Sequence, residues 1–169
     1  MLKIIILTIF IFTNALAYQS EDTLKAVIIG KIAKYITWDR DTNKKFVIAV
    51  LNANDKKLFD TIYNGKKVKK KFVVIKQVEN INKLQNADIL YISSTKAYDL
   101  PLILKKLKDK NIFTVSDIRG FAQKGGMMQV YFASQKVKLR TNLDKTNESN
   151  FKIKSSLLRI ADVLREENI

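Results

Sequence analysis

Four short apolar runs, each of strand length, alternate with segments of helical periodicity along much of the chain. The runs occupy residues 46–51, 72–75, 89–92 and 112–115. Continuous apolar runs of this length are typical of strands that helices cover on both faces. Strands that alternate with helices form parallel sheets with right-handed crossovers. The sequence therefore predicts an α/β fold: a single domain with a mostly parallel sheet flanked by helices.

The pattern changes after the glycine pair at Gly125-Gly126. Residues 127–133 and 136–141 have the alternation of two hairpin strands, with apolar and charged side chains on opposite faces of the second strand. A last amphipathic helix is predicted over residues 155–164, where apolar side chains recur at helical spacing. We therefore expect a C-terminal β-hairpin and a terminal helix beside the parallel sheet.

Residues 1–17 have the features of a secretory signal peptide. Lys3 supplies a positive charge, an apolar run follows, and a small-residue cleavage signature ends at Ala17. The alternative is an uncleaved membrane anchor, but the run is shorter than the ~20 apolar residues that a spanning helix needs. We expect cleavage after Ala17, export to the periplasm, and one domain over residues 18–169 that begins with a helix over residues 20–38.

The composition excludes several kinds of chemistry. The chain of 169 residues has no cysteine and no histidine, which removes thiol nucleophiles, Cys/His zinc sites and histidine acid–base catalysis. Its formal net charge of +15 favours acidic partners such as an anionic envelope surface or an acidic protein face. Alternatively, the lysines are spread over the solvent-exposed surface and the charge indicates no particular partner. Nucleic acid is a poor partner for an exported protein, and we expect no cofactor.

Polar side chains follow three of the predicted strands. Asn52 comes after the first strand, Ser93 and Ser94 come after the third, and Ser116 and Asp117 come after the fourth. The carboxyl ends of parallel strands meet at one edge of a sheet, where a crevice forms if the strand order reverses. Hydroxyls and one carboxylate suit binding more than catalysis, although a Ser–Lys arrangement remains formally open. A purely structural turn at Ser116-Asp117 is the competing interpretation.

Other candidate positions also have two interpretations each. The Gly125-Gly126 pair lacks the spacing of a phosphate-binding loop, and either forms a turn that needs positive φ or lets a ligand or partner backbone approach. Trp38, the only tryptophan, either anchors the core or contacts a partner.

Several segments together resemble the YfiR family of exported proteins. They are the end of the first helix at residues 34–38, the strand at 46–51, the stretch from Thr-Val-Ser-Asp to Gly-Gly-Met at 114–127, the segment 137–142 and the Leu-Leu and Ile-Ala pairs at 157–161. The stretch at 114–127, which includes Phe121, is the most specific of them. The resemblance covers nearly all of residues 18–169.

The resemblance implies a periplasmic α/β protein with a regulatory role. The best-understood member of the family binds the periplasmic sensor part of an inner-membrane diguanylate cyclase and holds cyclic diguanylate synthesis down. By this resemblance we expect a non-enzymatic repressor whose partner is the periplasmic domain of a diguanylate cyclase or sensor kinase. A homodimer is left open, and the alternative function is a periplasmic small-ligand or envelope-polymer binding protein. The candidate binding residues are Trp38, Ser93, Ser94, Ser116, Asp117, Phe121, Gly125 and Gly126.

The sequence departs from the family pattern at two places. Family members commonly carry a cysteine before the third strand, where this chain has Ala87-Asp88, so control through a disulfide does not carry over. The tryptophan is commonly followed by proline, and here Asp39 follows it.

Overall fold

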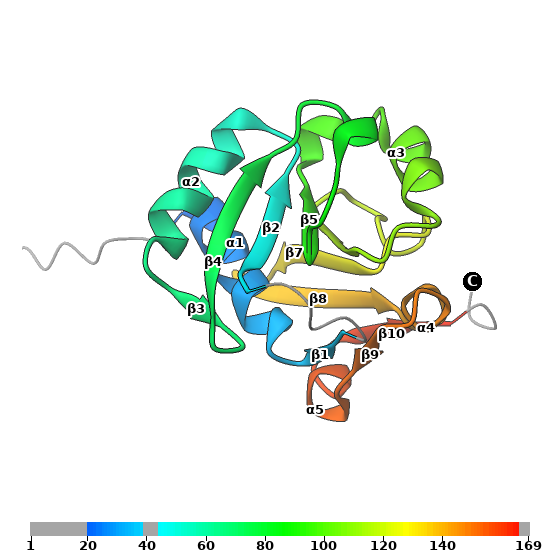
Figure 1. Cartoon of the computed structure of the whole chain (residues 1–169). Coiled ribbons are helices and arrows are strands. Elements are labelled where there is room, and N and C mark those ends of the chain that lie inside the picture. Colours follow the sequence, from blue (N-terminus) through cyan, green and yellow to red (C-terminus); the bar gives the residue numbers. More distant parts are fainter. Residues whose placement is uncertain (1–19, 39–43, 166–169) are drawn as a thin grey trace, which may run out of the picture.

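The computed structural model describes residues 20–38 and 44–165 (Figure 1). The predicted signal peptide at residues 1–17 and the departure at Asp39 lie outside these residues. Within the described part of the chain, no helix is long and apolar enough to cross a membrane.

The main sheet has eight strands in the order β10-β8-β7-β6-β5-β2-β4-β3. Five consecutive strands of this order, from β7 to β4, run parallel to one another. At the two ends of this group, β8 runs antiparallel to β7 and β3 runs antiparallel to β4. In chain order the strands are β2 (Phe46–Val50), β3 (Lys67–Val68), β4 (Lys71–Gln77), β5 (Ile89–Ile92), β6 (Phe113–Ser116), β7 (Met128–Ala133), β8 (Lys136–Asn142) and β10 (Asp162–Leu164). The predicted mostly parallel sheet is confirmed.

Helices cover both faces of this sheet. The α-helices are α1 (Glu21–Ala33), α2 (Ala53–Tyr63), α3 (Leu100–Leu107), α4 (Leu143–Glu148) and α5 (Ser155–Leu158), and the 3₁₀ turns are η1 (Ile81–Lys83) and η2 (Ser94–Lys96). Helices α1 and α2 lie on one side of the sheet and α3 on the other (Figure 1). Alternate residues of β2 belong to the two core layers: Ile48 packs with residues of α1 and α2, and Ala49 packs with residues of α3. Every residue of β2 is buried, as its continuous apolar sequence predicts.

A tyrosine hydroxyl locks α1 to α2. Tyr63 donates to the Ala26 carbonyl at 2.6 Å and accepts from the Gly30 amide at 2.7 Å. Gly30 permits this contact because a Cβ there would meet the Tyr63 hydroxyl at 2.6 Å. Burial raises the pKa of Tyr63 to about 12, with the Gly30 hydrogen bond opposing the shift. The phenol is therefore neutral and serves as a structural link.

The C-terminal region confirms the hairpin and corrects the length of the last helix. Strands β7 and β8 pair antiparallel across a turn at Ser134 and Gln135, whose φ angles are +50° and +58°. The terminal helix ends at Leu158, and Asp162–Leu164 forms β10, parallel to β8. The helical spacing did not reveal this strand because Asp162 is held by groups distant in sequence, accepting from Tyr131 at 2.6 Å and from Arg140 at 3.1 Å.

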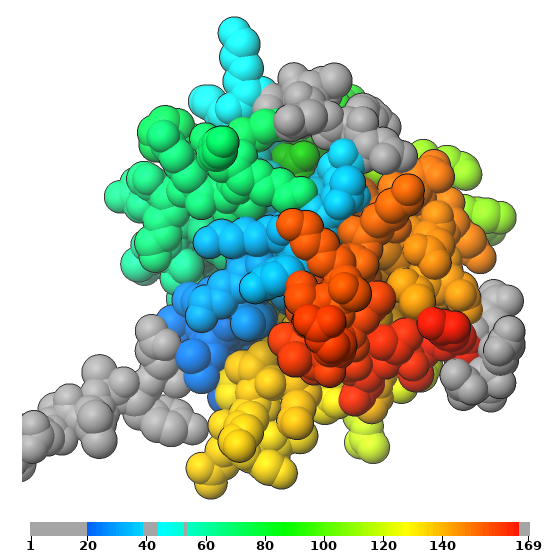
Figure 2. All heavy atoms as spheres, turned by 90° about the horizontal axis from the view of Figure 1, so that it is seen from below, coloured from blue at the N-terminus to red at the C-terminus, as the bar shows by residue number. Residues whose placement is uncertain are grey.

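The first helix is also shorter than predicted. It ends at Ala33, and Ile36–Thr37 forms strand β1, which pairs antiparallel with β9 (Lys152–Ile153). Ser20 caps the helix as expected, its side chain accepting from the Thr23 amide. Figure 2 shows the C-terminal segment lying against the chain that follows α1. Pairing between segments this distant leaves no local signal in the sequence.

The strand order reverses at β2. The chain leaves β2 for β4 on one side, then returns past β2 to β5 on the other. In open α/β sheets this reversal places a binding crevice at the carboxyl ends of the two adjacent strands whose connections leave in opposite directions. The carboxyl ends of β2 and β5 are therefore the position to inspect for a site.

Candidate functional site

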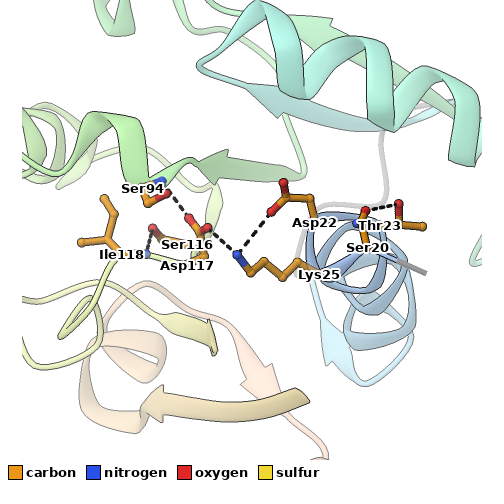
Figure 3. A network of polar contacts seen from close by, with 8 residues as sticks. All are labelled: Ser20, Asp22, Thr23, Lys25, Ser94, Ser116, Asp117 and Ile118. Carbon is orange, nitrogen blue, oxygen red and sulfur yellow. Dashed lines mark hydrogen bonds and ion pairs between the residues drawn. The ribbon is translucent and has the colours of Figure 1, made fainter. Parts of the chain in front are cut away.

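Asp117, directly after β6, is the centre of a polar cluster at this edge of the sheet (Figure 3). Its Oδ1 accepts from the Ser94 amide at 2.7 Å, and its Oδ2 accepts from Lys25 Nζ at 3.0 Å. The side chains of Lys25 and Asp117 are only 15% and 8% exposed, so their ion pair is largely shielded from water. Asp117 thereby connects α1, the segment after β5 and its own loop.

Asp22 is the second acidic neighbour of Lys25. Its Oδ1 lies 3.4 Å from Lys25 Nζ, one turn away on α1 (Figure 3). Burial opposes the charged form of Lys25, but the hydrogen bonds and charges of Asp117 and Asp22 outweigh it and raise the pKa of the lysine. Lys25 is therefore a permanent cation at the amino end of α1.

Asp55 and Tyr91 face the same cluster from α2 and β5. Burial raises the pKa of Asp55, a contact with Ser93 opposes that shift, and the charges of Asp117 and Asp22 add to it. Burial also raises the pKa of Tyr91, and Asp117 and Asp55 reinforce the effect. One oxygen of Asp55, Oδ2, is buried without a hydrogen-bond partner. The cluster thus contains acceptor capacity that the described protein groups do not use.

Ser116 has a structural position beneath the cluster. Its hydroxyl donates to the Ile92 carbonyl at 2.6 Å and accepts from the Ile118 amide at 2.9 Å. The residue is fully buried. These bonds fasten β6 to β5 and shape the turn that presents Asp117, as the structural interpretation of the Ser116-Asp117 pair requires.

The structure brings the five predicted strand-end residues together. Ser93, Ser94, Ser116 and Asp117 lie at the same edge, since Ile92 pairs with Ser116 across β5 and β6. Asn52, at the end of β2, donates from its amide to the Thr95 hydroxyl at 3.3 Å and caps α2. The expectation that these residues share one edge of the sheet is therefore correct.

Gly125, Gly126 and Phe121 lie in the segment that connects β6 to β7. Gly125 has a φ of +94°, which favours glycine, whereas a Cβ on Gly126 would lie 2.2 Å from the Phe121 ring. Phe121 is fully buried in the layer under α3. Close packing against an aromatic ring explains Gly126, and the left-handed turn explains Gly125.

Trp38 lies at the opposite end of the sheet. Its indole Nε1 donates to the Asp88 carbonyl, just before β5, at 3.2 Å. Its ring packs against Phe46, Phe113 and Phe151, with centroid distances of 5.5, 6.3 and 6.0 Å. Trp38 is therefore a core anchor that lies apart from the Asp117 cluster.

Sequence reasoning missed Lys25, Asp55 and Tyr91. Lys25 falls on an amphipathic helix where lysine is normally solvated, and its partner Asp117 is 92 residues away. Tyr91 lies inside an apolar strand. Their positions along the chain could have indicated the site. Asp55 follows β2, and Tyr91 lies one residue before the end of β5, the strand that pairs with β2.

The cluster is equipped for binding. The carboxylates of Asp117 and Asp22 contact the Lys25 ammonium, and the Asp55 carboxyl and the neutral Tyr91 phenol lie close enough to Asp117 to feel its charge. Such a set accepts a cationic or hydrogen-bond-donating group. Among the residues that the structure describes, no group of three histidine, cysteine or acidic side chains is arranged to hold a metal ion.

The fold and this edge define an open doubly wound α/β protein with a polar cluster at its topological switch point. The family model for DUF4154, described as YfiR/HmsC-like, matches residues 22–162. The chain belongs to this family, as the resemblance of its segments predicted. A search of the curated proteins finds no match.

Solved structures share the fold at low sequence identity. The ABC domain in complex with L-Trp from Streptococcus pneumonia has a TM-score of 0.56 and 11% identity, over 85% of this chain and 60% of that one. A conserved domain protein from Vibrio cholerae has a TM-score of 0.58 and 11% identity, over 87% and 60%. A third structure is the ligand-free, open structure of CD0873, a substrate binding protein with adhesive properties from Clostridium difficile. Its TM-score is 0.51 and its sequence identity is 14%, over 72% of this chain and 54% of that one. The chain spans about 60% of the length of the first two structures.

Proposed function

We propose that the protein is a periplasmic regulatory protein that binds the periplasmic sensor domain of an inner-membrane signalling protein, a diguanylate cyclase in the first instance, and represses it. The observation that carries this proposal is the match to the YfiR/HmsC-like family, which spans the described fold from α1 to β10. The signal peptide predicted at residues 1–17 supports the compartment. The polar cluster supports binding over catalysis, because its lysine is held in ion pairs.

An exposed apolar surface next to the switch point supports a protein partner. Tyr98, which follows η2, is 96% exposed, and Leu102 on α3 is 55% exposed. Tyr98 lies just before Asp99, the N-cap of α3, and Leu102 lies in the first turn of the helix, so both exposed side chains are at its amino end. Exposed aromatic side chains of this kind are frequent anchors in protein interfaces.

Chemical cross-linking followed by purification from membranes tests this function. The mature protein should recover an inner-membrane protein that has a periplasmic domain and a cyclase or kinase output. Tyr98→Ser should reduce the recovery at least about fivefold, which corresponds to about 1 kcal/mol of binding free energy. Tyr35→Ser is the matched control, since Tyr35 is also exposed but belongs to the segment after α1. Failure to recover any membrane signalling protein would contradict the proposal.

A second function, small-ligand binding at the switch point, is favoured by the unpartnered Oδ2 of Asp55. Similar folds occur in the complex with L-Trp and in the substrate binding protein described above. Free amino acids, whose ammonium group suits carboxylate acceptors, are the appropriate calorimetric probes. Asp55→Asn should weaken such binding without unfolding the domain, whereas Ser116 and Asp117 are unsuitable for this test because both hold the fold together. No heat of binding from any free amino acid would count against this function.

A further inference from the structure

The outer edge of β4 is only partly paired. Strand β3 covers Lys71 and Phe72, where its two residues form the antiparallel pairs. From Val73 to Gln77, β4 pairs with β2 on its inner side, and no strand of the described residues pairs with its outer side (Figure 1). An unpaired strand edge is a template for another strand.

The direction of the backbone groups along β4 can be read from two hydrogen bonds. The Val73 amide donates outward to the Lys66 carbonyl at 3.0 Å, and the Val78 amide donates inward to the Val50 carbonyl at 2.8 Å. Because alternate residues of a strand direct their backbone groups to opposite sides, the N–H and C=O of Ile75 and Gln77 point outward. This edge therefore presents a short ladder of donors and acceptors.

A groove runs beside the same edge. It has a volume of about 690 Å³ and is lined by the end of α2, the turn at Gly65 and residues 73–75 of β4. Phe72 is 55% exposed at the start of the strand. An extended peptide laid along the edge would contact the groove and the Phe72 side chain while it bonds to the backbone.

Lysines surround the edge and select the charge of the occupant. They include the exposed side chains of Lys66, Lys67, Lys70 and Lys76. Asp60, which also lines the groove, is paired with Lys56. Two copies of this edge would bring like charges together, which disfavours self-association. An acidic segment gains from the same charges, and the backbone ladder requires that this segment be a polypeptide strand.

We propose that the outer edge of β4 binds an extended acidic segment of another protein by strand addition. The backbone of Ile75 and Gln77 supplies the hydrogen bonds, Phe72 supplies an apolar contact, and the surrounding lysines supply selectivity for acidic side chains. The site is distinct from the Asp117 cluster, and its test does not depend on the identity of the membrane partner.

Titration of the ¹⁵N-labelled mature protein with a blocked peptide tests this proposal. The probe has the length of β4, seven residues, and alternates glutamate with valine and threonine. We expect saturable amide shifts confined to residues 66–77, and slower hydrogen exchange at Ile75 and Gln77. Ile75→Pro should abolish them, because proline removes an outward N–H and leaves the pairing with β2 intact. Because the Ile75 side chain also packs against the core, Ile75→Ala is the control: it keeps the outward N–H, should lower the thermal midpoint as well, and should still bind the probe.

Two controls separate strand addition from simple charge attraction. A probe that alternates glutamate with proline cannot pair with the edge and should produce no saturable shifts. The variant Lys66→Glu/Lys70→Glu/Lys76→Glu should weaken binding at least about tenfold, and Lys83→Glu/Lys105→Glu/Lys136→Glu, at exposed positions elsewhere, should weaken it far less. Equal binding of both probes, shifts spread over all lysines, or an edge-dependent homodimer in sedimentation would each overturn the proposal.

Discussion

Replacing Asp117 with alanine is expected to lower the free energy of unfolding by about 3 kcal/mol, because removal of one partner from a shielded ion pair leaves the other charge uncompensated. Lys25 would keep only Asp22, at 3.4 Å and on the exposed side. The Ser94 amide would also lose its acceptor. Since the pKa of Lys25 is raised, the lysine stays charged, and the loss should be constant from neutral pH up to values well below 10.5, the ordinary pKa of lysine.

Urea unfolding measures this loss, and a double-mutant cycle assigns it. With Lys25→Met as the second variant, we expect a coupling energy of at least about 1 kcal/mol between Lys25 and Asp117. Asp22→Asn is the matched control and should cost under about 1 kcal/mol, since the Asp22 side chain is 75% exposed. Additive losses from Lys25→Met and Asp117→Ala would contradict a direct interaction.

Gly126→Ala is expected to destabilise the domain by about 3 kcal/mol. The added methyl would lie between 2.2 and 2.4 Å from three atoms of the Phe121 ring, which is fully buried in the core, so the overlap can be relieved only by shifting packed groups. The thermal midpoint should fall by roughly 6 to 12 °C for a domain of this size. Far-ultraviolet circular dichroism during heating provides the measurement.

The matched control for this variant is Gly65→Ala. Gly65 has a φ of +66° and no atom within 4 Å of an added Cβ, so its cost comes from backbone strain alone, about 1 kcal/mol. The combination Phe121→Leu/Gly126→Ala should be more stable than the sum of its single variants predicts, because the smaller side chain relieves the overlap. A Gly126→Ala protein with native stability would show that Gly126 does not set this packing.

The core strands could be predicted because their sequence is buried on both faces. Residues 89–92 are apolar without interruption, and β5 has these bounds. The short strands β1, β9 and β10 could not be predicted, since each depends on a partner elsewhere in the chain. Asp162, for example, belongs to a strand because Arg140 and Tyr131 hold it there.

The sequence was sufficient to predict at which edge of the sheet the candidate site lies, but not all of the residues that form it. Polar residues after parallel strands must share an edge, which places Ser94 beside Asp117. The sequence gives no indication that Lys25 reaches Asp117, because the direction of α1 across the sheet is set by tertiary packing. Ser116 illustrates the converse, since a hydroxyl that suits a binding site proves to bond only to the backbone.

Cyclic diguanylate in living cells tests the proposed regulatory role most directly. Deletion of the gene in the organism of origin should raise the nucleotide, and the full-length protein should restore the original level. A version that lacks residues 1–17 should fail to restore it, because the proposed partner surface lies in the periplasm. An unchanged nucleotide level after deletion, or full restoration by the version without residues 1–17, would contradict repression of a membrane diguanylate cyclase from the periplasm.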